Sequence, residues 1–375
     1  MRGAPALAGN VLYVPISSAE EVLAADARYP CCTFRGGITA LDALTGTVLW
    51  RGYAVGQAPQ PTTKSAAGVQ LWGPSGAAIW SSPTIDLKQQ IVYAATGDSY
   101  SDPPGDGSDA FVAFRMATGE RVWVRQMTAG DVFNIGCVLP APVNCPPVMG
   151  PDFDFGSSPI LVDLANGKRA LIAGQKSGVV HAVDPDRAGA VLWQTRVGHG
   201  GRLGGVQWGS AADSDHVYVA VSDLVMHGAA AGEPGAEKAP YDGRSFRLDP
   251  AAGGGLFALS LETGEVVWHT PHPGCGETPG CSPAQSAAVT AIPGIVFSGG
   301  LDGHLRAYAA KAGAIVWDVD TKQAYATVNG VPAHGGSLDG PGAVVVGGML
   351  YVNSGYAHFG TTPGNVLLAF SVDGK

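Results

Sequence analysis

Residues 307–320, "AYAAKAGAIVWDVD", contain the pattern that decides the fold. A short apolar strand leads to a turn that closes on Gly313, and a second strand follows and carries Trp317. Glycine suits the positive φ that a hairpin loop of about three to five residues requires. The stretch therefore predicts a β-hairpin with one large aromatic side chain on its second strand.

The same template occurs several more times along the chain. Each full copy has a strand ending in Ala and an apolar residue, a turn closing on Gly, and a strand ending in Trp: residues 36–52, 108–126, 177–196 and 254–270. A sixth copy, residues 363–375, stops at the turn. Another strand precedes each hairpin, as in "NVLYVP" (10–15) and "QIVYAATG" (90–97). The repeat therefore predicts units of several antiparallel strands.

The spacing of the tryptophans indicates the architecture. Trp268 and Trp317 are 49 residues apart, close to one four-stranded propeller blade of about 40–50 residues, and the longer spacings fit a blade with a loop excursion. A β-solenoid or a sandwich is the alternative, but equal turns that each lead to a large aromatic favour radial blades. We expect an all-β propeller of about six blade units, with the tryptophans packed between blades.

The two ends of the repeat predict an incomplete ring. The sixth copy lacks its Trp strand, and the strand around Leu12 already belongs to the first unit. We therefore expect one domain over residues 1–375, with missing blades upstream and an unpaired sheet edge.

Composition narrows the class of protein. The chain has 375 residues, 55 glycines, 27 prolines, 14% charged residues and a net charge of -9. The acidic balance, with no run of Lys and Arg, argues against a nucleic-acid partner. No apolar window approaches the roughly 20 residues of a membrane span, and the first residues lack the apolar core of a secretion signal.

Six cysteines occur as close pairs in loops: Cys31 and Cys32, Cys137 and Cys145, Cys275 and Cys281. An even number in such pairs favours disulfides and an oxidising compartment over free thiols. The chain contains no CxxCH motif, so it attaches no c-type haem of its own.

The Ala-x-Asp-x-x-Thr-Gly-x-x-x-Trp-like hairpins resemble the tryptophan-docking motifs of the pyrroloquinoline quinone (PQQ) dependent alcohol dehydrogenases, which are eight-bladed propellers. Within that family, four stretches look most like the polyvinyl alcohol dehydrogenases: "YPCCTFRGGITALDALTG" (29–46), "LWGPSGAAIWSSPTID" (71–86), "VGHGGRLGGVQWGSAAD" (197–213) and "GNVLLAFSVDGK" (364–375). The resemblance covers essentially the whole chain. With six of eight blade signatures present, it implies that the N-terminal blades, and any cytochrome c domain before them, are absent, so we expect weak or no activity from this chain alone.

The resemblance implies a PQQ- and metal-dependent dehydrogenase. It also implies that the protein is periplasmic or secreted. Its substrate would be a secondary alcohol such as polyvinyl alcohol or a similar polymer, and its electrons would pass to a separate cytochrome c. Such an enzyme needs a divalent cation, a carboxylate that takes the alcohol proton, and a cationic donor near the quinone oxygens. Ca²⁺ is the expected metal, with a lanthanide as the alternative.

The first two units supply part of the implied site. "ISSAEEV" (16–22) resembles the segment of a metal-binding Glu, which makes Glu21 or Glu20 the ligand, and "FRGG" places Arg35 beside the site. Trp80 matches the floor under the cofactor. Asp98 follows 18 residues later, where the family usually has a metal-binding Asn, and either oxygen donor suits Ca²⁺. An acidic turn and a core tryptophan are the structural alternatives.

The third unit supplies the implied chemistry. "GPDFDFGSSPILVD" (150–163) resembles the segment of the catalytic base, which makes Asp152 the base and a metal ligand, although Pro151 replaces the usual aromatic. Asp154 resembles an additional metal ligand of the lanthanide-using branch. Two acids so close can share a metal or raise each other's pKa. Lys176 is implied to bond the quinone oxygens. An acidic surface turn and a loop lysine are the alternatives.

Two further matches are weaker. Gln207 and Trp208 lie in a segment that resembles a cofactor lining, although Trp208 fits a core position equally well. Cys31 and Cys32 are similar to the vicinal disulfide of the family, but by the resemblance that pair belongs to an earlier blade. We therefore expect a disulfide in a surface loop at this position.

A second function fits the same repeat. Non-enzymatic PQQ-like propellers that bind proteins, such as outer-membrane assembly lipoproteins, keep the docking tryptophans without the polar set. The presence of Glu21, Asp98, Asp152 and Lys176 at family-like spacings favours the enzyme.

Overall fold

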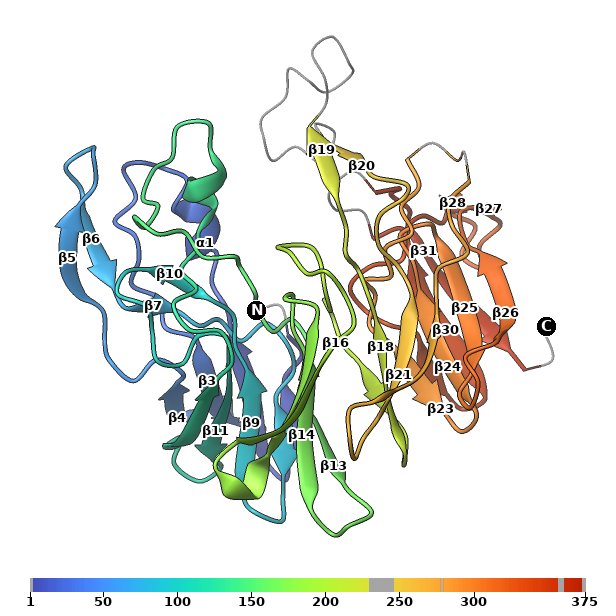
Figure 1. Cartoon of the computed structure of the whole chain (residues 1–375), viewed down its shortest axis with the longest axis horizontal. Coiled ribbons are helices and arrows are strands. Elements are labelled where there is room, and N and C mark those ends of the chain that lie inside the picture. The colour runs from blue at the N-terminus through green and yellow to red at the C-terminus, as the bar shows by residue number, and fades with distance from the viewer. Residues whose placement is uncertain (1–2, 229–245, 277, 279, 357–360, 373–375) are drawn as a thin grey trace. The chain divides into compact units, whose positions relative to one another are not determined.

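The chain divides into two compact units. The computed structural model describes residues 3–228, 246–276, 278, 280–356 and 361–372 (Figure 1). The first unit consists of Met1–Lys176 and His181–Trp193, and the second of Ser177–Val180 and Gln194–Lys375. The last three residues of the sixth copy, 373–375, lie outside the described residues.

The first half of the chain forms three four-stranded antiparallel sheets with sequential strands (Figure 1). The first sheet comprises β1 (Ala6–Ala8), β2 (Val11–Ile16), β3 (Gly37–Asp42) and β4 (Val48–Tyr53). The second comprises β8 (Thr84–Asp86), β9 (Ile91–Ala95), β11 (Ala110–Arg115) and β12 (Arg121–Gln126). The third comprises β13 (Ile160–Asp163), β14 (Arg169–Gly174), β15 (Val179–Asp184) and β16 (Ala190–Arg196).

The second half continues the series. The fourth sheet comprises β17 (Ala211–Ala212), β18 (His216–Ala220), β21 (Leu256–Ser260) and β22 (Val266–Thr270). The fifth comprises β23 (Thr290–Ile292), β24 (Ile295–Gly299), β25 (His304–Ala309) and β26 (Ile315–Asp320). The sixth has three described strands, β29 (Val344–Val346), β30 (Met349–Ser354) and β31 (Val366–Ser371). The predicted all-β class and the six blade-like sheets are confirmed, and the single-domain arrangement over 1–375 stays a prediction.

Short elements project from the sheets. Four two-stranded ribbons are described: β5 (Gln60–Lys64) with β6 (Gln70–Gly73), β7 (Ser75–Gly76) with β10 (Ser99–Ser101), β19 (Met226–Gly228) with β20 (Phe246–Leu248), and β27 (Ala324–Tyr325) with β28 (Ala333–His334). Helical segments are α1 (Glu20–Leu23) and 3₁₀ turns at Ile135–Val138 and Pro185–Arg187. Within the described ranges, no helix has the length and hydropathy that crossing a membrane requires.

The hairpins repeat one register. In each hairpin whose full register is described, the Ala of the third strand lies opposite the Trp of the fourth, and the ladder shifts just after this pair: Ala40 and Trp50, Ala113 and Trp123, Ala258 and Trp268, Ala307 and Trp317. The turn glycines have φ between +70° and +73°: Gly46, Gly119, Gly189, Gly264 and Gly313. The predicted positive φ is therefore confirmed.

Three of the hairpin tryptophans, Trp50, Trp123 and Trp268, pack on the turn glycine of the next sheet. A Cβ placed on Gly119 would lie 2.3 Å from Cε3 of Trp50, and one on Gly313 would lie 2.6 Å from Cε3 of Trp268. The indole Nε1 of Trp50 donates to the Met116 carbonyl at 2.9 Å, and that of Trp268 donates to a carbonyl of the fifth sheet at 2.8 Å. The predicted packing of tryptophans between blades is confirmed, and a bare glycine is what permits it.

The cysteines form three disulfides: Cys31–Cys32, Cys137–Cys145 and Cys275–Cys281. The predicted pairing of all six is confirmed. The expectation of a surface loop for the first pair is wrong, because Cys31 and Cys32 are 1% and 0% exposed. They are covered because the loop folds inward against the apolar side chains of Ala78 and Tyr100.

We predict that Gly313→Ala destabilises the chain more than Gly294→Ala does. Both glycines have positive φ, so each alanine carries the cost of left-handed backbone, about 1–2 kcal/mol. A Cβ at Gly294 has no heavy atom within 4 Å, whereas one at Gly313 collides with Trp268. The collision adds about 1–3 kcal/mol, measurable by urea unfolding followed by circular dichroism. Equal losses in the two variants would contradict the docking role of Gly313.

Candidate functional site

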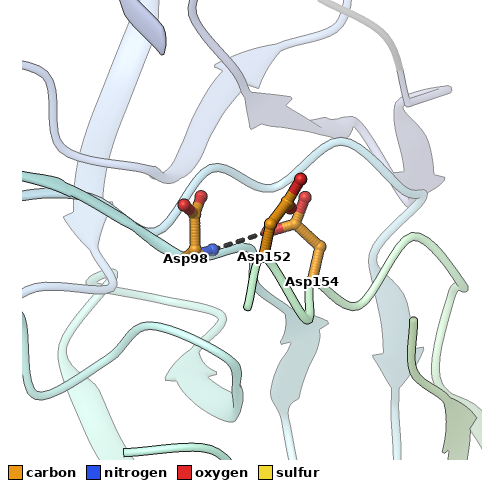
Figure 2. Close-up of side chains that lie close together, drawn as sticks. All are labelled: Asp98, Asp152 and Asp154. Carbon is orange, nitrogen blue, oxygen red and sulfur yellow. Dashed lines mark hydrogen bonds between the residues drawn. The ribbon is translucent and has the colours of Figure 1, made fainter. Parts of the chain in front are cut away.

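Three carboxylates converge in the first unit. Asp98 follows β9, and Asp152 and Asp154 precede β13. Each offers one carboxylate oxygen, and these oxygens lie within 4.8 Å of one another (Figure 2). The residues Asp98, Asp152 and Asp154 are 2%, 5% and 7% exposed. These three positions, which the sequence predicts as metal ligands, therefore lie together, and we call them the carboxylate cluster; their roles stay predictions.

Buried strands hold the cluster in place. All five residues of β9 are buried, and so are the first five of β11. Phe155, next to Asp154, is also fully buried, and its ring centroid lies 5.1 Å from that of Phe111 in β11. The segment that carries the third carboxylate is therefore anchored in the core of the second sheet.

A close backbone contact joins the two sides of the cluster. The N–H of Asp98 donates to Oδ1 of Asp154 at 2.7 Å, as Figure 2 shows. A Cβ on Gly97 would lie 2.6 Å from the same oxygen, so only glycine permits this approach. Oδ2 of Asp98 is buried and has no hydrogen-bond partner among the described residues. The cluster thus leaves one buried carboxylate oxygen unused.

Lys176 neutralises part of the cluster. Its Nζ lies 2.7 Å from Oδ1 of Asp152 and 2.8 Å from Oδ2 of Asp154. The same nitrogen is 5.6 Å from the ring centroid of Trp80. Lys176 follows β14 and is 8% exposed. The prediction that it lies beside the acids and the tryptophan is met, and its contact with a quinone stays a prediction.

Charge is crowded in this region. Burial raises the pKa of Asp98 well above its usual value, and the charges of Asp154 and Asp152 raise it further. Burial also raises the pKa of Asp152, which Lys176 offsets in part. Although burial acts to lower the pKa of Lys176, the neighbouring carboxylates outweigh it and hold the pKa high. Three carboxylates thus surround one ammonium group, which is the electrostatic setting of a cation site.

The two candidate glutamates of α1 have different surroundings. The carboxylate of Glu20 accepts the N–H groups of Thr33 and Phe34 at 2.7–2.9 Å and the hydroxyl of Tyr29 at 2.9 Å. The charge of Glu21 raises the pKa values of Asp98 and Lys176, so Glu21 acts electrostatically on the cluster. Glu20 is therefore a structural anchor of the cysteine loop, and Glu21 is the better ligand candidate.

The vicinal disulfide and Trp80 belong to one apolar cluster. Its buried members are Ala24, Cys31, Cys32, Ala78 and Tyr100, and Trp80 packs against them. The position that a Cβ of Gly97 would occupy lies 3.4 Å from Nε1 of Trp80. Trp80 thus has apolar neighbours on one side and the cluster residues Lys176 and Asp154 close by.

Three other predicted residues have contacts elsewhere. The guanidinium of Arg35 lies 3.8 Å from the centroid of the Tyr53 ring and donates to the Val55 carbonyl at 3.3 Å. In the second unit, Nε2 of Gln207 donates to the Gly204 carbonyl at 2.6 Å, and Nε1 of Trp208 donates to Asp339 at 2.8 Å. Their roles toward a cofactor stay predictions.

Two buried acids near the cluster were missed by the sequence analysis. Asp109 is 0% exposed, and both its carboxylate oxygens lack a hydrogen-bond partner among the described residues. Burial, followed by the charge of Asp131, raises its pKa well above the usual value. Asp131 is also 0% exposed and bonds the backbone of Asp152. The available signal was an Asp directly before the apolar strand "AFVAF" (110–114).

Two family models match separate parts of the chain. Residues 2–144 match the beta-propeller domain of glucose, ethanol and alcohol dehydrogenases. Residues 176–334 match the outer membrane protein assembly factor BamB.

Known proteins match the whole chain. It is 44% identical over 390 residues to a protein named polyvinylalcohol dehydrogenase from Pseudomonas sp., covering 100% of this chain and 57% of that one. A polyvinylalcohol dehydrogenase from Sphingopyxis sp. (strain 113P3) is 42% identical, covering 97% and 55%. The chain thus spans about half the length of these relatives. The chain also superposes on the structure of the quinohemoprotein alcohol dehydrogenase from Comamonas testosteroni, with a TM-score of 0.64 and 19% sequence identity. The match includes 100% of this chain and 60% of the Comamonas chain, and it shows a shared fold.

We predict that Asp98→Asn stabilises the metal-free protein at alkaline pH. The folded pKa of Asp98 is raised, so the folded state holds a proton that the unfolded chain has released. Stability therefore falls as the pH rises from the usual aspartate pKa through the raised one. The amide removes this loss, and we expect a melting temperature about 2–4 °C higher in EDTA at about pH 8, with a smaller gain at about pH 5.

The control is Asp163→Asn, at an exposed position of β13, which should show no such pH-dependent gain. A lower melting temperature for Asp98→Asn than for the unchanged chain at about pH 8 would contradict the crowding of charge.

Proposed function

The chain belongs to the quinoprotein alcohol dehydrogenase family, and we propose that it carries the catalytic centre of a PQQ- and metal-dependent dehydrogenase that oxidises secondary alcohols. The observation that supports this most is the carboxylate cluster beside Lys176 and Trp80, because it combines the acid, cation and aromatic groups that such chemistry needs.

The donor set fits a metal ion. Oδ2 of Asp98 is buried without a partner, and the three carboxylates exceed the single positive charge of Lys176. Hard cations such as Ca²⁺ prefer carboxylate oxygens, and a trivalent lanthanide would balance more of the charge. Asp98, Asp152 and Asp154 would hold the ion, with Glu21 adding charge to the site.

The apolar cluster fits a flat cofactor. Trp80 offers an aromatic face, and Cys31–Cys32 lies in the same cluster of side chains. When bound, PQQ accepts two electrons and the hydrogen of the carbinol carbon, while the metal polarises its carbonyl. Lys176 is the proposed donor of hydrogen bonds to negatively charged quinone oxygens, and the position of its Nζ 5.6 Å from the Trp80 ring centroid supports this role. Arg35, Gln207 and Trp208 stay proposed as further cofactor contacts.

Asp152 is the proposed proton acceptor. Its pKa is raised by burial, which brings its basicity closer to that of a general base working near neutral pH. Lys176 contacts Asp152 at 2.7 Å and favours the ionised form that can receive the hydroxyl proton. Burial thus increases the basicity of Asp152, and Lys176 opposes part of that effect.

Substrate, partner and location are proposals drawn from the relatives. The names of the relatives from Pseudomonas and Sphingopyxis support polyvinyl alcohol or a similar polymeric alcohol as the substrate. A cytochrome c is proposed as the electron acceptor. The three disulfides favour an oxidising compartment, such as the periplasm or the exterior of the cell.

A protein-binding scaffold is the second candidate, because residues 176–334 match an outer-membrane assembly factor. That match covers hairpin repeats and excludes Asp98, Asp152 and Asp154. A scaffold has no need for buried, crowded carboxylates, which cost stability. The enzyme therefore explains more of the first unit.

The two candidates differ in ligand binding. We predict that PQQ together with Ca²⁺ raises the melting temperature of the chain, since a ligand present at about 100 times its Kd adds about 2.7 kcal/mol of stability. Melting is followed by circular dichroism, with Ca²⁺ alone and PQQ alone as controls. A folded protein with the complete ring whose melting temperature does not change would favour the scaffold.

We further predict that, in a longer protein that also contains the expected upstream blades, Asp152→Asn lowers kcat by about 10²- to 10⁴-fold, because the amide cannot accept the hydroxyl proton. PQQ binding should persist. Turnover is measured with a secondary alcohol, PQQ, Ca²⁺ and an artificial electron-accepting dye, and Asp163→Asn serves as the exposed control. Unchanged turnover in Asp152→Asn would remove Asp152 from its proposed role.

A further inference from the structure

Asp131 holds the backbone at Asp152. Its Oδ1 accepts the N–H of Asp152 at 3.1 Å, and its Oδ2 accepts the N–H of Phe153 at 2.7 Å. Asp131 itself is completely buried. A Cβ on Gly150 would lie 2.1 Å from Oδ1 of Asp131, so the chain reaches these contacts through a glycine.

The backbone of Asp152 needs such support. Its φ is +62°, in the left-handed region that is unfavourable for residues with a side chain. In this conformation its carboxylate reaches Nζ of Lys176 at 2.7 Å. The N–H groups of Asp152 and Phe153 donate to the two carboxylate oxygens of Asp131, which favours this backbone conformation over extended alternatives.

Asp131 also contacts the segment of Asp98. The N–H of Ser99 donates to the Asp131 carbonyl at 3.1 Å, and the N–H of Phe133 donates back to Ser99 at 2.8 Å. The main chain of Asp131 is thus fixed beside Asp98, while its side chain is bonded to the backbone of Asp152. One residue thus links the two segments that carry the three cluster carboxylates.

The segment after Asp131 extends this link toward α1. Nδ2 of Asn134 donates to the Tyr100 carbonyl at 2.9 Å, and Nδ2 of Asn144 donates to the Ala24 carbonyl at 3.0 Å. Ala24 directly follows α1, which carries Glu21. The contacts therefore reach all the segments that supply the proposed metal ligands.

We propose that Asp131 is a positioning residue, which holds Asp152 in its left-handed conformation and at a fixed place relative to Asp98 without touching substrate or cofactor. This inference rests on the proposed function, in which Asp152 receives the proton and both residues bind the metal. Groups that orient metal ligands in this way typically change metal affinity or activity by about 10- to 100-fold when mutated.

Asp131→Asn is the principal test. The amide keeps the shape of the side chain, but it has one acceptor oxygen and turns an NH₂ group toward the second N–H donor. The probe is Tb³⁺ alone, whose luminescence is excited through Trp80 near the cluster. We expect Tb³⁺ affinity to fall about 10- to 100-fold, and kcat, measured in a longer protein with the expected upstream blades, to fall similarly, with KM and PQQ affinity unchanged within about twofold.

Asp86→Asn is the matched control. Asp86 is 3% exposed, its Oδ1 accepts the N–H groups of Lys88 and Gln89 at 3.0 Å, and it forms an ion pair with Arg169. It lies at the opposite end of β9 from Asp98. This variant should lower the melting temperature at least as much as Asp131→Asn, yet keep Tb³⁺ affinity and kcat. Equal behaviour of the two variants overturns the proposal.

A second variant and a second measurement test the proposal if Asp131→Asn does not fold. Asp131→Ser removes both carboxylate acceptors without an amide donor, and hydrogen–deuterium exchange of residues 151–155 should become faster in it. Unchanged exchange overturns the proposal. If the unchanged chain binds neither Tb³⁺ nor PQQ, the proposed function fails, and the exchange experiment still decides whether Asp131 fixes Asp152.

Discussion

The contact between a hairpin tryptophan and the turn glycine of the next sheet is the interaction on which the rest of each unit depends. Trp50 on Gly119 and Trp268 on Gly313 combine buried aromatic area with a directional hydrogen bond from the indole. Trp123 on Gly189 makes the same contact between the second and third sheets. Asp98 follows a strand of the second sheet and Asp154 precedes the third, so their 2.7 Å hydrogen bond requires that the spacing of these two sheets does not vary.

The carboxylate cluster lowers the stability of the folded chain, because it buries acidic groups close to one another. Asp98 and Asp152 are buried acids with raised pKa values, and one ammonium group does not balance them. Such an arrangement persists when the surroundings over-determine it. Here the fully buried strands β9 and β11, and the ring of Phe155 against them, supply that constraint. The rigid packing of the repeat therefore keeps the unfavourable arrangement of the cluster in place.

The fold was predictable from sequence because its signals are local: each turn, glycine and tryptophan lies within one short hairpin. The spacing of 18 residues between Trp80 and Asp98 could also be recognised in the sequence, because one hairpin-like segment carries both residues. Asp131 was not, because its role depends on hydrogen bonds to a backbone 21 residues away and on complete burial. The buried position of Cys31–Cys32 was missed for the same reason, since contacts with Ala78 are invisible in the local pattern.

The short range of the disulfides has a consequence for how the chain matures. The bonded cysteines are 1, 8 and 6 residues apart, so every cross-link closes inside a single connection and none ties one sheet to another. Each bond can form during synthesis or export, before distant strands have met. Oxidation therefore cannot lock blades in a wrong order, and the chain needs an oxidant for its thiols but little help from a disulfide isomerase.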